Sequence, residues 1–409
     1  MLHKILMISH HDVWGDLNTF SPMLKILQKL SAEGIHVDFV STEKKKEFDE
    51  SSRKYGEPVS YIAEHISINR IGTLPPAVLK VLYKNTFIKR VVSKLITEVI
   101  FPIQVYQKYK NCRDYDLVYG YEIYGVKVAA KLAKKFGKPL VTRFQGSFLR
   151  SWEEAYGAAY CRKKYKLHYQ ALSTKADLII MTNDGTQGDK TLRALHNDEN
   201  MRFWRNGFDF SPLPESKAEL RERLGLQQDT FYTVSVCRLA TWKRCERIVE
   251  AYKHVGLPAE RMQHLFVGDG EERANLERQI RAYGLEEYFV FCGSQPHAKV
   301  KEYLQASDTF LSFFDSTNSG NPLIEAVKIH LPIVTYDVGD TNTVIENDVN
   351  GILLPDPDPV RIAAVMEKLV TDESLRNKLM EGAKRSSEMF YSWETRVENE
   401  LEELRRLTQ

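Results

Sequence analysis

The segment SFFDSTNSGNPLIEAVKIHLPIVTYDVGD, residues 312–340, decides the fold of this chain. It reads as a short apolar strand, a small polar loop, a helix and a second apolar strand. Strand, helix and parallel strand form the repeating unit of doubly wound α/β proteins, which bind ligands at the carboxyl ends of their strands. The polar loop 316–321 follows such an end, so this segment also predicts a binding site.

The same alternation extends along the rest of the chain. The strand candidates before residue 210 are KILMIS (4–9), HVDFVS (36–41), DLVYG (116–120), PLVTRF (139–144) and DLIIMT (177–182). Those after it are YTVSVCR (232–238), MQHLFVG (262–268), YFVFCG (288–293), DTFLSFF (308–314), LPIVTYD (331–337) and GILLP (351–355). Continuous apolar strands indicate parallel sheets covered on both faces. We therefore predict an α/β chain with two doubly wound, Rossmann-like domains, over residues 1–207 and 208–389, followed by a last helix within 390–409.

Composition excludes several classes of protein. The chain has 409 residues, of which 43% are hydrophobic and 27% charged, as in ordinary globular proteins. A net charge of +2 gives no reason to expect nucleic-acid binding. We see no signal peptide and no apolar run long enough for a transmembrane helix. The five scattered cysteines form no Cys-x-x-Cys pair, which favours a reducing, cytoplasmic location and no metal site.

One basic stretch interrupts the alternation. Residues 76–101 have helical periodicity, with Ile88, Leu95 and Val99 among the apolar residues of one face and lysines on the other. From Arg70 to Arg113 there are nine Lys or Arg residues and one acidic residue. Such a helix could lie on the anionic inner face of a membrane, through residues 76–113, or be a domain helix with a solvated basic face.

Three segments of the second half carry chemistry. Arg238 follows a strand and Lys243 is expected to open the next helix, an arrangement that suits a diphosphate but also a solvated loop. FVGDGEER (266–273) is a glycine-rich turn between a strand and a helix. In loop 316–321, Asn321 is expected to cap a helix with Pro322 at its first position. Glu325 would then lie in the first turn, either as a favourable helix charge or as an acceptor for a ribose diol.

These segments together resemble the glycosyltransferase family 4 enzymes, which have the GT-B fold. The resemblance covers nearly the whole chain and is strongest from about residue 200 to residue 357. The motifs that carry it are Asn206-Gly207-x-Asp209, SVCRLATWK (235–243), Gly268-x-Gly270, GNPLIEA (320–326), LPIVTYDVG (331–339) and NGILLP (350–355). Cys237 stands where the family usually has glycine. The ordered set is far more specific than any one motif.

The resemblance implies a nucleotide-sugar donor, with UDP-sugar favoured, bound by the second domain across a cleft from an acceptor on the first. It implies that the last helix packs back on the first domain. Transfer would retain the anomeric configuration and need no cofactor, because cationic side chains replace a metal ion. The acceptor would be a glycan or a lipid-linked molecule, as in bacterial polysaccharide or glycoconjugate synthesis.

By their positions in these motifs, Arg238 and Lys243 would neutralise the diphosphate, and Glu325 would bind the ribose. The other residues of the implied donor site are Asn206, Gly268, Cys292, Asn318, Gly320, Asn321, Pro322 and Leu323. The family often has a carboxylate eight positions before this glutamate, where it touches the donor sugar. Thr317 stands there in this chain. Either Asp315 substitutes for it from a shifted loop, or backbone groups and Asn318 do the work.

The first domain also departs from the family. The family's His-Gly is here Gln145-Gly146, and glutamine can hydrogen-bond a sugar hydroxyl but cannot titrate. Front-face, SNi-like transfer needs no titrating base, because the leaving phosphate can accept the acceptor's proton. In the loop after the first strand, the candidates for acceptor contact are Gly15, Asp16, Asn18 and His11. Helix capping, or a plain polar strand end, explains the last three equally well.

Other functions stay open at this point. Thr317 and Gln145 motivate a catalytically degenerate GT-B protein that binds a nucleotide sugar or a partner. A GT-B epimerase or a phosphorylase would share the fold. A two-lobed solute-binding protein is also α/β in both lobes, but the donor motifs and the lack of a signal peptide count against it.

Overall fold

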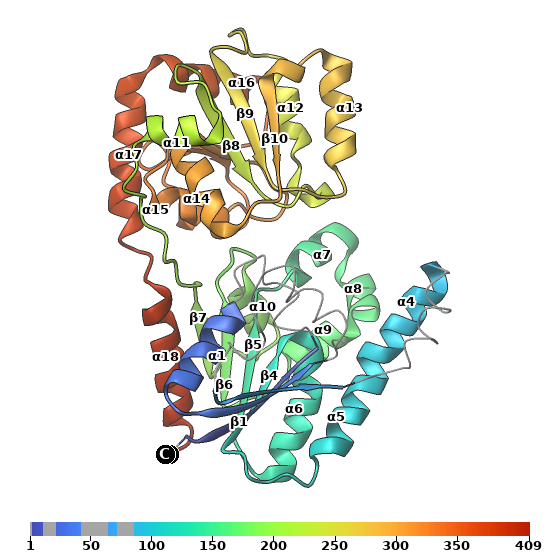
Figure 1. Cartoon of the computed structure of the whole chain (residues 1–409). Coiled ribbons are helices and arrows are strands. Elements are labelled where there is room, and N and C mark those ends of the chain that lie inside the picture. The colour runs from blue at the N-terminus through green and yellow to red at the C-terminus, as the bar shows by residue number, and fades with distance from the viewer. Residues whose placement is uncertain (1, 11–21, 42–63, 72–85) are drawn as a thin grey trace. The chain divides into compact units, whose positions relative to one another are not determined.

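The computed structural model describes residues 2–10, 22–41, 64–71 and 86–409, and the chain divides into two compact units. Unit 1 contains Met1–Asn183, Gln187–Gly207 and Trp393–Gln409, and unit 2 contains Asp184–Thr186 and Phe208–Ser392. Each unit is built on its own parallel β-sheet with helices packed against it (Figure 1). The prediction of two doubly wound α/β domains is confirmed.

The sheet of unit 1 has the order β3-β2-β1-β4-β5-β6-β7, and every pair is parallel. Its strands are β1 (Lys4–Ser9), β2 (His36–Ser41), β3 (Ile66–Arg70), β4 (Leu117–Tyr121), β5 (Leu140–Phe144), β6 (Leu178–Thr182) and β7 (Met201–Trp204). The sequence analysis missed the two edge strands, β3 and β7. Edge strands are only partly covered, so they carry polar residues and lack the continuous apolar run that identified the central ones.

Helices of unit 1 cover both faces of this sheet. The helices are α1 (Pro22–Ala32), α4 (Thr86–Leu95), α5 (Phe101–Tyr109), α6 (Glu122–Phe136), α7 (Leu149–Tyr156), α8 (Ala158–Lys164), α9 (Lys166–Leu172), α10 (Gly188–Ala194) and α18 (Trp393–Arg406). Residues that alternate along β1 go to opposite sides: Met7 packs in a core with α1 and α18, and Ile8 packs in a core with α5 and α6. The C-terminal helix is therefore part of the core of unit 1.

Unit 2 has the sheet order β10-β9-β8-β11-β12-β13, again all parallel. Its strands are β8 (Phe231–Val236), β9 (Met262–Val267), β10 (Phe289–Gly293), β11 (Thr309–Ser312), β12 (Ile333–Tyr336) and β13 (Ile352–Leu354). Its α-helices are α11 (Lys217–Leu224), α12 (Glu246–Tyr252), α13 (Arg273–Tyr283), α14 (His297–Ala306), α15 (Asn321–Lys328), α16 (Pro359–Thr371) and α17 (Glu373–Ser387). Short 3-10 turns are η3 (Thr241–Lys243), η4 (Glu286–Tyr288) and η5 (Thr341–Thr343).

The basic amphipathic stretch is helical from Thr86, and its first ten residues lie outside the described residues. Between α4 and α5 it contains a π-helical turn, η2 (Ile96–Ile100). This wider turn brings Ile96, Phe101 and Val105 onto the buried side. The apolar face expected from a regular helix is largely exposed instead, with Leu95 49% and Val99 44% accessible. In the part of the chain that the structure describes, no helix is long and apolar enough to cross a membrane.

A buried ion cluster attaches α18 to the sheet of unit 1. The Glu400 carboxylate is 3.1 Å from Nη1 of Arg143 on β5 and 2.8 Å from Nη1 of Arg396 one turn earlier. The hydroxyl of Tyr119 on β4 donates to its Oε1 over 2.7 Å. Burial alone would raise the pKa of Glu400, but the two arginines outweigh it and hold the pKa below its usual range. The carboxylate therefore stays charged at neutral pH, opposite two cations that are also fully buried.

We expect Glu400→Gln to destabilise the protein by about 3–5 kcal/mol, because it leaves two buried arginines without a counter-ion. Glu402→Gln, on the exposed side of the same helix, should change stability by less than about 0.5 kcal/mol. Urea unfolding of both variants measures the difference. The triple change Arg143→Met, Arg396→Met, Glu400→Leu should recover most of the loss. Equal midpoints for Glu400→Gln and the wild type would contradict this reading of the cluster.

Because the folded-state pKa of Glu400 is depressed, its contribution to stability is present above the unfolded pKa of a glutamate and is lost as the pH falls through the folded value. The stability difference between wild type and Glu400→Gln should therefore shrink in acid.

Candidate functional site

The candidate site of unit 2 lies at the carboxyl edge of its sheet, where the strand order reverses. β8 and β11 are neighbours at the centre of the sheet, and the chain leaves them toward opposite edges. This is the topological switch point at which doubly wound folds bind ligands. The segment after β8 carries Arg238 and Lys243, and the segment after β11 carries loop 315–320. The backbone N–H of Asp315 donates to the carbonyl of Trp242 over 3.3 Å, so the two segments are joined.

Lys243 lies between aromatic rings at this point. Its ammonium nitrogen is 3.7 Å from the ring centroid of Phe314 and 4.0 Å from that of Trp242. The ring faces attract a cation but do not neutralise it, and no carboxylate among the described residues pairs with it. Burial lowers the pKa of Lys243 to about 8, although the thiols of Cys237 and Cys245 act in the opposite direction. A poorly hydrated ammonium of this kind is well suited to meet a phosphate.

Arg238 is placed differently from Lys243. Its side chain is 73% exposed, and its Nη2 is 3.0 Å from the carboxylate of Glu271. Water and salt screen an exposed ion pair of this type, so it contributes little and a diphosphate can compete for the guanidinium. Both cations therefore lie beside the carboxyl end of β8, but their charged groups do not converge on one position.

Lys243 does not open the next helix, as the sequence analysis expected. It ends the 3-10 turn η3, and α12 begins three residues later at Glu246. Arg244 adopts a left-handed conformation, with φ of +50°, and this separates the two elements.

The glycine-rich turn after β9 packs directly against the backbone after β8. A Cβ atom on Gly268 would lie 1.9 Å from the carbonyl oxygen of Cys237, and one on Gly270 would lie 2.3 Å from that of Leu239. The N–H of Leu239 donates to the carbonyl of Asp269 over 3.0 Å. The Gly-x-Gly motif is therefore needed for close backbone approach, and it fixes the segment that carries Arg238.

Glu325 lies in α15 with 7% of its surface exposed. Its Oε1 is 3.0 Å from Nε2 of His297, at the start of α14, and accepts a hydrogen bond when that nitrogen carries the proton. The ring of Phe210 packs 5.2 Å from that of His297. His297 thus orients the carboxylate that the sequence analysis assigned to the ribose. The sequence analysis missed His297, because only the tertiary structure brings α14 beside α15.

The start of α15 differs from the expected one. The helix begins at Asn321 with Gly320 as its N-cap, so Asn321 is not the cap and Pro322 is the second helical residue. The N–H groups of Leu323 and Ile324 donate to the Gly320 carbonyl over 3.2 and 3.3 Å. Glu325 therefore lies one position beyond the first turn, where the helix dipole acts on it less strongly. The expectation failed because proline fits the second helical position as well as the first.

Loop 315–319 holds the candidates for the role of the family's first carboxylate. The Asp315 carboxylate is 2.7 Å from Nη2 of Arg247 on α12 and 3.5 Å from Nε of Arg244. The Thr317 hydroxyl is 2.9 Å from that of Ser319. Asn318 is 1% exposed, and its Oδ1 accepts from the N–H of Phe314 over 2.9 Å, so this side chain shapes the loop. The sequence analysis did not single out Arg247, although it lies one helical turn after Lys243 in the chain.

Cys292 lies near the end of β10, at the position implied for base contact. It is half-buried, and burial raises the pKa of its thiol to about 11. Its carbonyl oxygen accepts a hydrogen bond from the side-chain amide of Gln295. A thiol with a pKa this high stays protonated and unreactive at neutral pH.

The candidate residues of unit 1 lie at the carboxyl edge of the other sheet. Gln145 follows β5, and its amide is held on both sides: Nε2 donates to Tyr121 over 2.8 Å, and Oε1 accepts from Thr182 over 3.2 Å. Gly146 has φ of +128°, a conformation that favours glycine. Asn206 is buried at the end of this unit. The candidates Gly15, Asp16, Asn18 and His11 lie outside the described residues.

Comparison with known proteins agrees with this geometry. Residues 216–386 match the family model "Glycosyl transferases group 1". The matched region contains the Arg238–Lys243 segment, the Gly-x-Gly turn and Glu325.

Curated relatives include several glycosyltransferases. The chain is 29% identical over 213 residues to alpha-D-kanosaminyltransferase of Streptomyces kanamyceticus. That match covers 51% of this chain and 55% of the relative. It is 26% identical over 170 residues to alpha-monoglucosyldiacylglycerol synthase of Acholeplasma laidlawii. That match covers 40% of this chain and 42% of the relative. The chain thus spans about half the length of the curated relatives it matches.

Similar solved structures establish the fold over the whole chain. HepE of Anabaena in complex with UDP and glucose aligns with a TM-score of 0.71 at 18% identity, covering 98% of this chain and 99% of that one. Sucrose-phosphate synthase of Thermosynechococcus elongatus aligns with a TM-score of 0.73 at 18% identity, covering 99% of both chains. The chain has the two-domain α/β GT-B fold that the sequence analysis predicted.

The pKa of Lys243 predicts how nucleotide affinity depends on pH. The charged ammonium is the form that attracts a diphosphate, and with a pKa of about 8 it is largely lost by pH 9. We expect UDP affinity, measured by calorimetry, to fall by up to about tenfold between pH 7 and pH 9. The terminal phosphate of UDP has a pKa of about 6, so it is about nine-tenths ionised at pH 7 and does not lose negative charge toward pH 9.

Lys243→Arg should flatten this dependence, because arginine stays charged. Lys253→Arg, at an exposed position after α12, should leave the wild-type profile unchanged. Parallel profiles for Lys243→Arg and the wild type would show that another group causes the pH dependence.

Proposed function

We propose that this chain is a retaining glycosyltransferase that moves a sugar from a nucleotide sugar, with UDP-sugar favoured, to a glycan or lipid-linked acceptor. The observation that carries the proposal is the assembly around the β8–β11 switch point. Arg238, whose exposed ion pair a ligand can displace, and the poorly hydrated Lys243 follow β8, and Glu325, oriented by His297, lies in the helix after β11. All three lie inside the region that matches the glycosyl transferases group 1. The UDP-bound and glucose-bound states of HepE support the choice of donor class.

The side chains of this chain can supply each step of the proposed chemistry. Lys243 and Arg238 stabilise the negative charge that develops on the leaving diphosphate, which is the usual role of fixed cations in a dry site. The His297–Glu325 pair holds the ribose and so sets the position of the anomeric carbon. The acceptor's proton passes to the leaving phosphate on the same face of the sugar, so the loss of a titrating histidine at Gln145 does not block transfer. The absence of a metal requirement remains a prediction.

Calorimetric titration with UDP, GDP and ADP tests the donor site. We expect one nucleotide to bind, and Glu325→Ala to weaken it by at least about tenfold, because two hydrogen bonds to a charged group are lost. Glu381→Ala, at an exposed position of α17, is the matched control and should bind as the wild type does. If the folded protein bound none of the three nucleotides, the donor-site assignment would be abandoned.

A second function, nucleotide-sugar binding without transfer, is favoured by one observation. Asp315 is neutralised by Arg247 and Arg244, and Thr317 carries no charge, so the loop offers no free carboxylate to the donor sugar. Turnover separates the two functions. Release of UDP from the bound UDP-sugar with a glycan or lipid acceptor supports transfer. Tight binding without turnover on any acceptor supports nucleotide-sugar binding without transfer. Isomerisation of the donor without acceptor would indicate an epimerase.

We further propose that unit 1 contacts an anionic membrane surface through α4, η2 and α5. Six of the fifteen large hydrophobic residues that are exposed in the described part of the chain lie within 87–103. They recur about every four residues and so form one stripe: Phe87, Ile88, Val91, Leu95, Val99 and Ile103. An exposed apolar stripe of this length indicates a partner surface that covers it.

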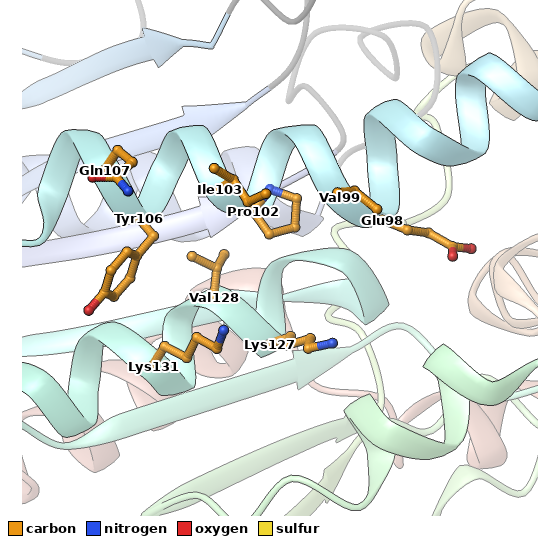
Figure 2. A pocket seen from close by; sticks show the side chains of 9 residues that line it. All are labelled: Glu98, Val99, Pro102, Ile103, Tyr106, Gln107, Lys127, Val128 and Lys131. Atoms are coloured by element: carbon orange, nitrogen blue, oxygen red, sulfur yellow. The ribbon is translucent and has the colours of Figure 1, made fainter.

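A pocket beside the stripe adds the charge. It has a volume of about 350 Å³ and lies between η2–α5 and α6 (Figure 2). Val99, Pro102 and Ile103 form its apolar wall, and Lys127 and Lys131 line it from α6. Glu98 also lines the pocket, and its carboxylate is 3.9 Å from the ammonium of Lys94. The two lysines are four residues apart, where like charges repel, and neither has an ion pair within the described residues. Anionic lipid headgroups would complement the charge of the two lysines, while the apolar stripe inserts into the membrane interface.

Liposome sedimentation tests the membrane contact. We expect the wild type to sediment with anionic vesicles more than with neutral ones, and less at high salt. The double variant Val91→Glu, Leu95→Glu should stay in the supernatant, whereas Val290→Glu, at an exposed apolar position of unit 2, should sediment as the wild type does. Equal sedimentation with anionic and neutral vesicles would rule out this contact.

A further inference from the structure

Two cysteines meet inside the candidate donor site. The Sγ atoms of Cys237 and Cys245 are 3.6 Å apart, and the residues are 9% and 4% exposed. Cys237 follows β8 and Cys245 precedes α12, so the pair closes the turn that carries Arg238 and Lys243. The family motif usually has glycine at position 237, so the GT-B fold does not require this thiol.

The backbone on both sides keeps the two thiols together. The N–H of Cys237 donates to the Val267 carbonyl over 3.1 Å, and its own carbonyl is packed against Gly268. Arg244 takes the left-handed conformation that turns the chain back, so that Cys245 occupies the N-cap position of α12. Both thiols point into the core of unit 2.

The pKa values of the two thiols are shifted in opposite directions. The hydrogen bond from Cys245, together with the positive charge of Lys243, lowers the pKa of Cys237 in spite of burial. The same contact with Cys237, together with burial, raises the pKa of Cys245. Cys237 is therefore the sulfur that ionises first, and the thiolate is the nucleophile in thiol oxidation.

We propose that Cys237 and Cys245 are a redox modification site, at which a peroxide closes an intramolecular disulfide and thereby weakens nucleotide binding. The Cys237 thiolate attacks one peroxide oxygen and becomes a sulfenic acid, and the other oxygen leaves and is protonated to water. The Cys245 sulfur then attacks the Cys237 sulfur and expels a second water. Two thiols lose two electrons and two protons in total, and one hydrogen peroxide is reduced to two waters.

Closure of the disulfide would draw the two ends of the turn together. A disulfide requires an S–S distance of about 2.05 Å, so the two sulfurs must approach by about 1.5 Å from their separation in the dithiol. Gly268 and Gly270 leave no space behind Cys237 and Leu239, because the carbonyl oxygens already occupy the positions of the missing Cβ atoms. Movement of the backbone would therefore fall on the turn around Lys243 and would shift the ammonium that lies between Trp242 and Phe314.

The test separates bond formation from its effect on binding. The purified full chain is treated with hydrogen peroxide, quenched and alkylated, and the intact mass and a peptide map are recorded. We expect the wild type to lose two alkylatable thiols and about 2 Da, with a cross-link between the peptides of Cys237 and Cys245. Cys112→Ser, a thiol outside this turn, should behave in the same way. Cys237→Ala and Cys245→Ala should form no cross-link, and circular dichroism checks that each is folded.

UDP titration of the same samples measures the consequence, which rests on the proposed function. We expect oxidation to weaken UDP binding by at least roughly fivefold in the wild type and in Cys112→Ser, and dithiothreitol to restore it. Oxidation should not change binding in folded Cys237→Ala. Two thiols that stay alkylatable, or sulfonic acid without a cross-link, would overturn the site. A cross-link with unchanged affinity would overturn its effect on binding.

Failure of the proposed function has a different signature. In that case the reduced wild type binds no UDP, GDP or ADP, and the peptide map still decides whether the disulfide forms.

Discussion

The buried carboxylate of Glu400 is the interaction on which unit 1 depends. It lies between two fully buried arginines, one on the sheet and one on its own helix, so removing it would leave charges that no water can solvate. Parallel sheets need both faces covered, and on one face α18 supplies part of that cover from the far end of the sequence. The ion cluster allows α18 only one register on the sheet, because a shift by one residue would rotate Glu400 away from Arg143.

Unit 2 depends on a steric constraint of a different kind. The backbone after β8 and the turn after β9 approach so closely that only glycine fits at positions 268 and 270. That contact fixes the turn holding Lys243 at the place where the strand order reverses. The result is a cation with aromatic neighbours and little water, and burial lowers its pKa to about 8. The proposed donor site and the proposed disulfide share this turn. A change in the turn's geometry on oxidation would therefore affect nucleotide binding.

The sequence analysis predicted the central strands well, because a buried parallel strand leaves a continuous apolar run such as KILMIS or DLIIMT. It missed β3 and β7, whose edge positions allow polar residues. It placed the start of α15 one residue late, because Pro322 is compatible with two positions of a first turn. It also expected a regular helix over 76–101, whereas the π-helical turn at 96–100 turns Ile96 inward and leaves Leu95 and Val99 exposed.

The sequence by itself determined the α/β class, the parallel sheets and the segments after two strands that carry Arg238, Lys243 and Glu325, since hydrophobic periodicity and motif order are local properties of a chain. Only the tertiary structure decided which partners these residues meet. His297 orients Glu325, Arg247 holds Asp315, and Cys245 contacts Cys237 because packing brings together segments that sequence spacing leaves unrelated. Burial and the pKa of Lys243 follow from that packing, because desolvation depends on every neighbour in space and not on neighbours along the chain.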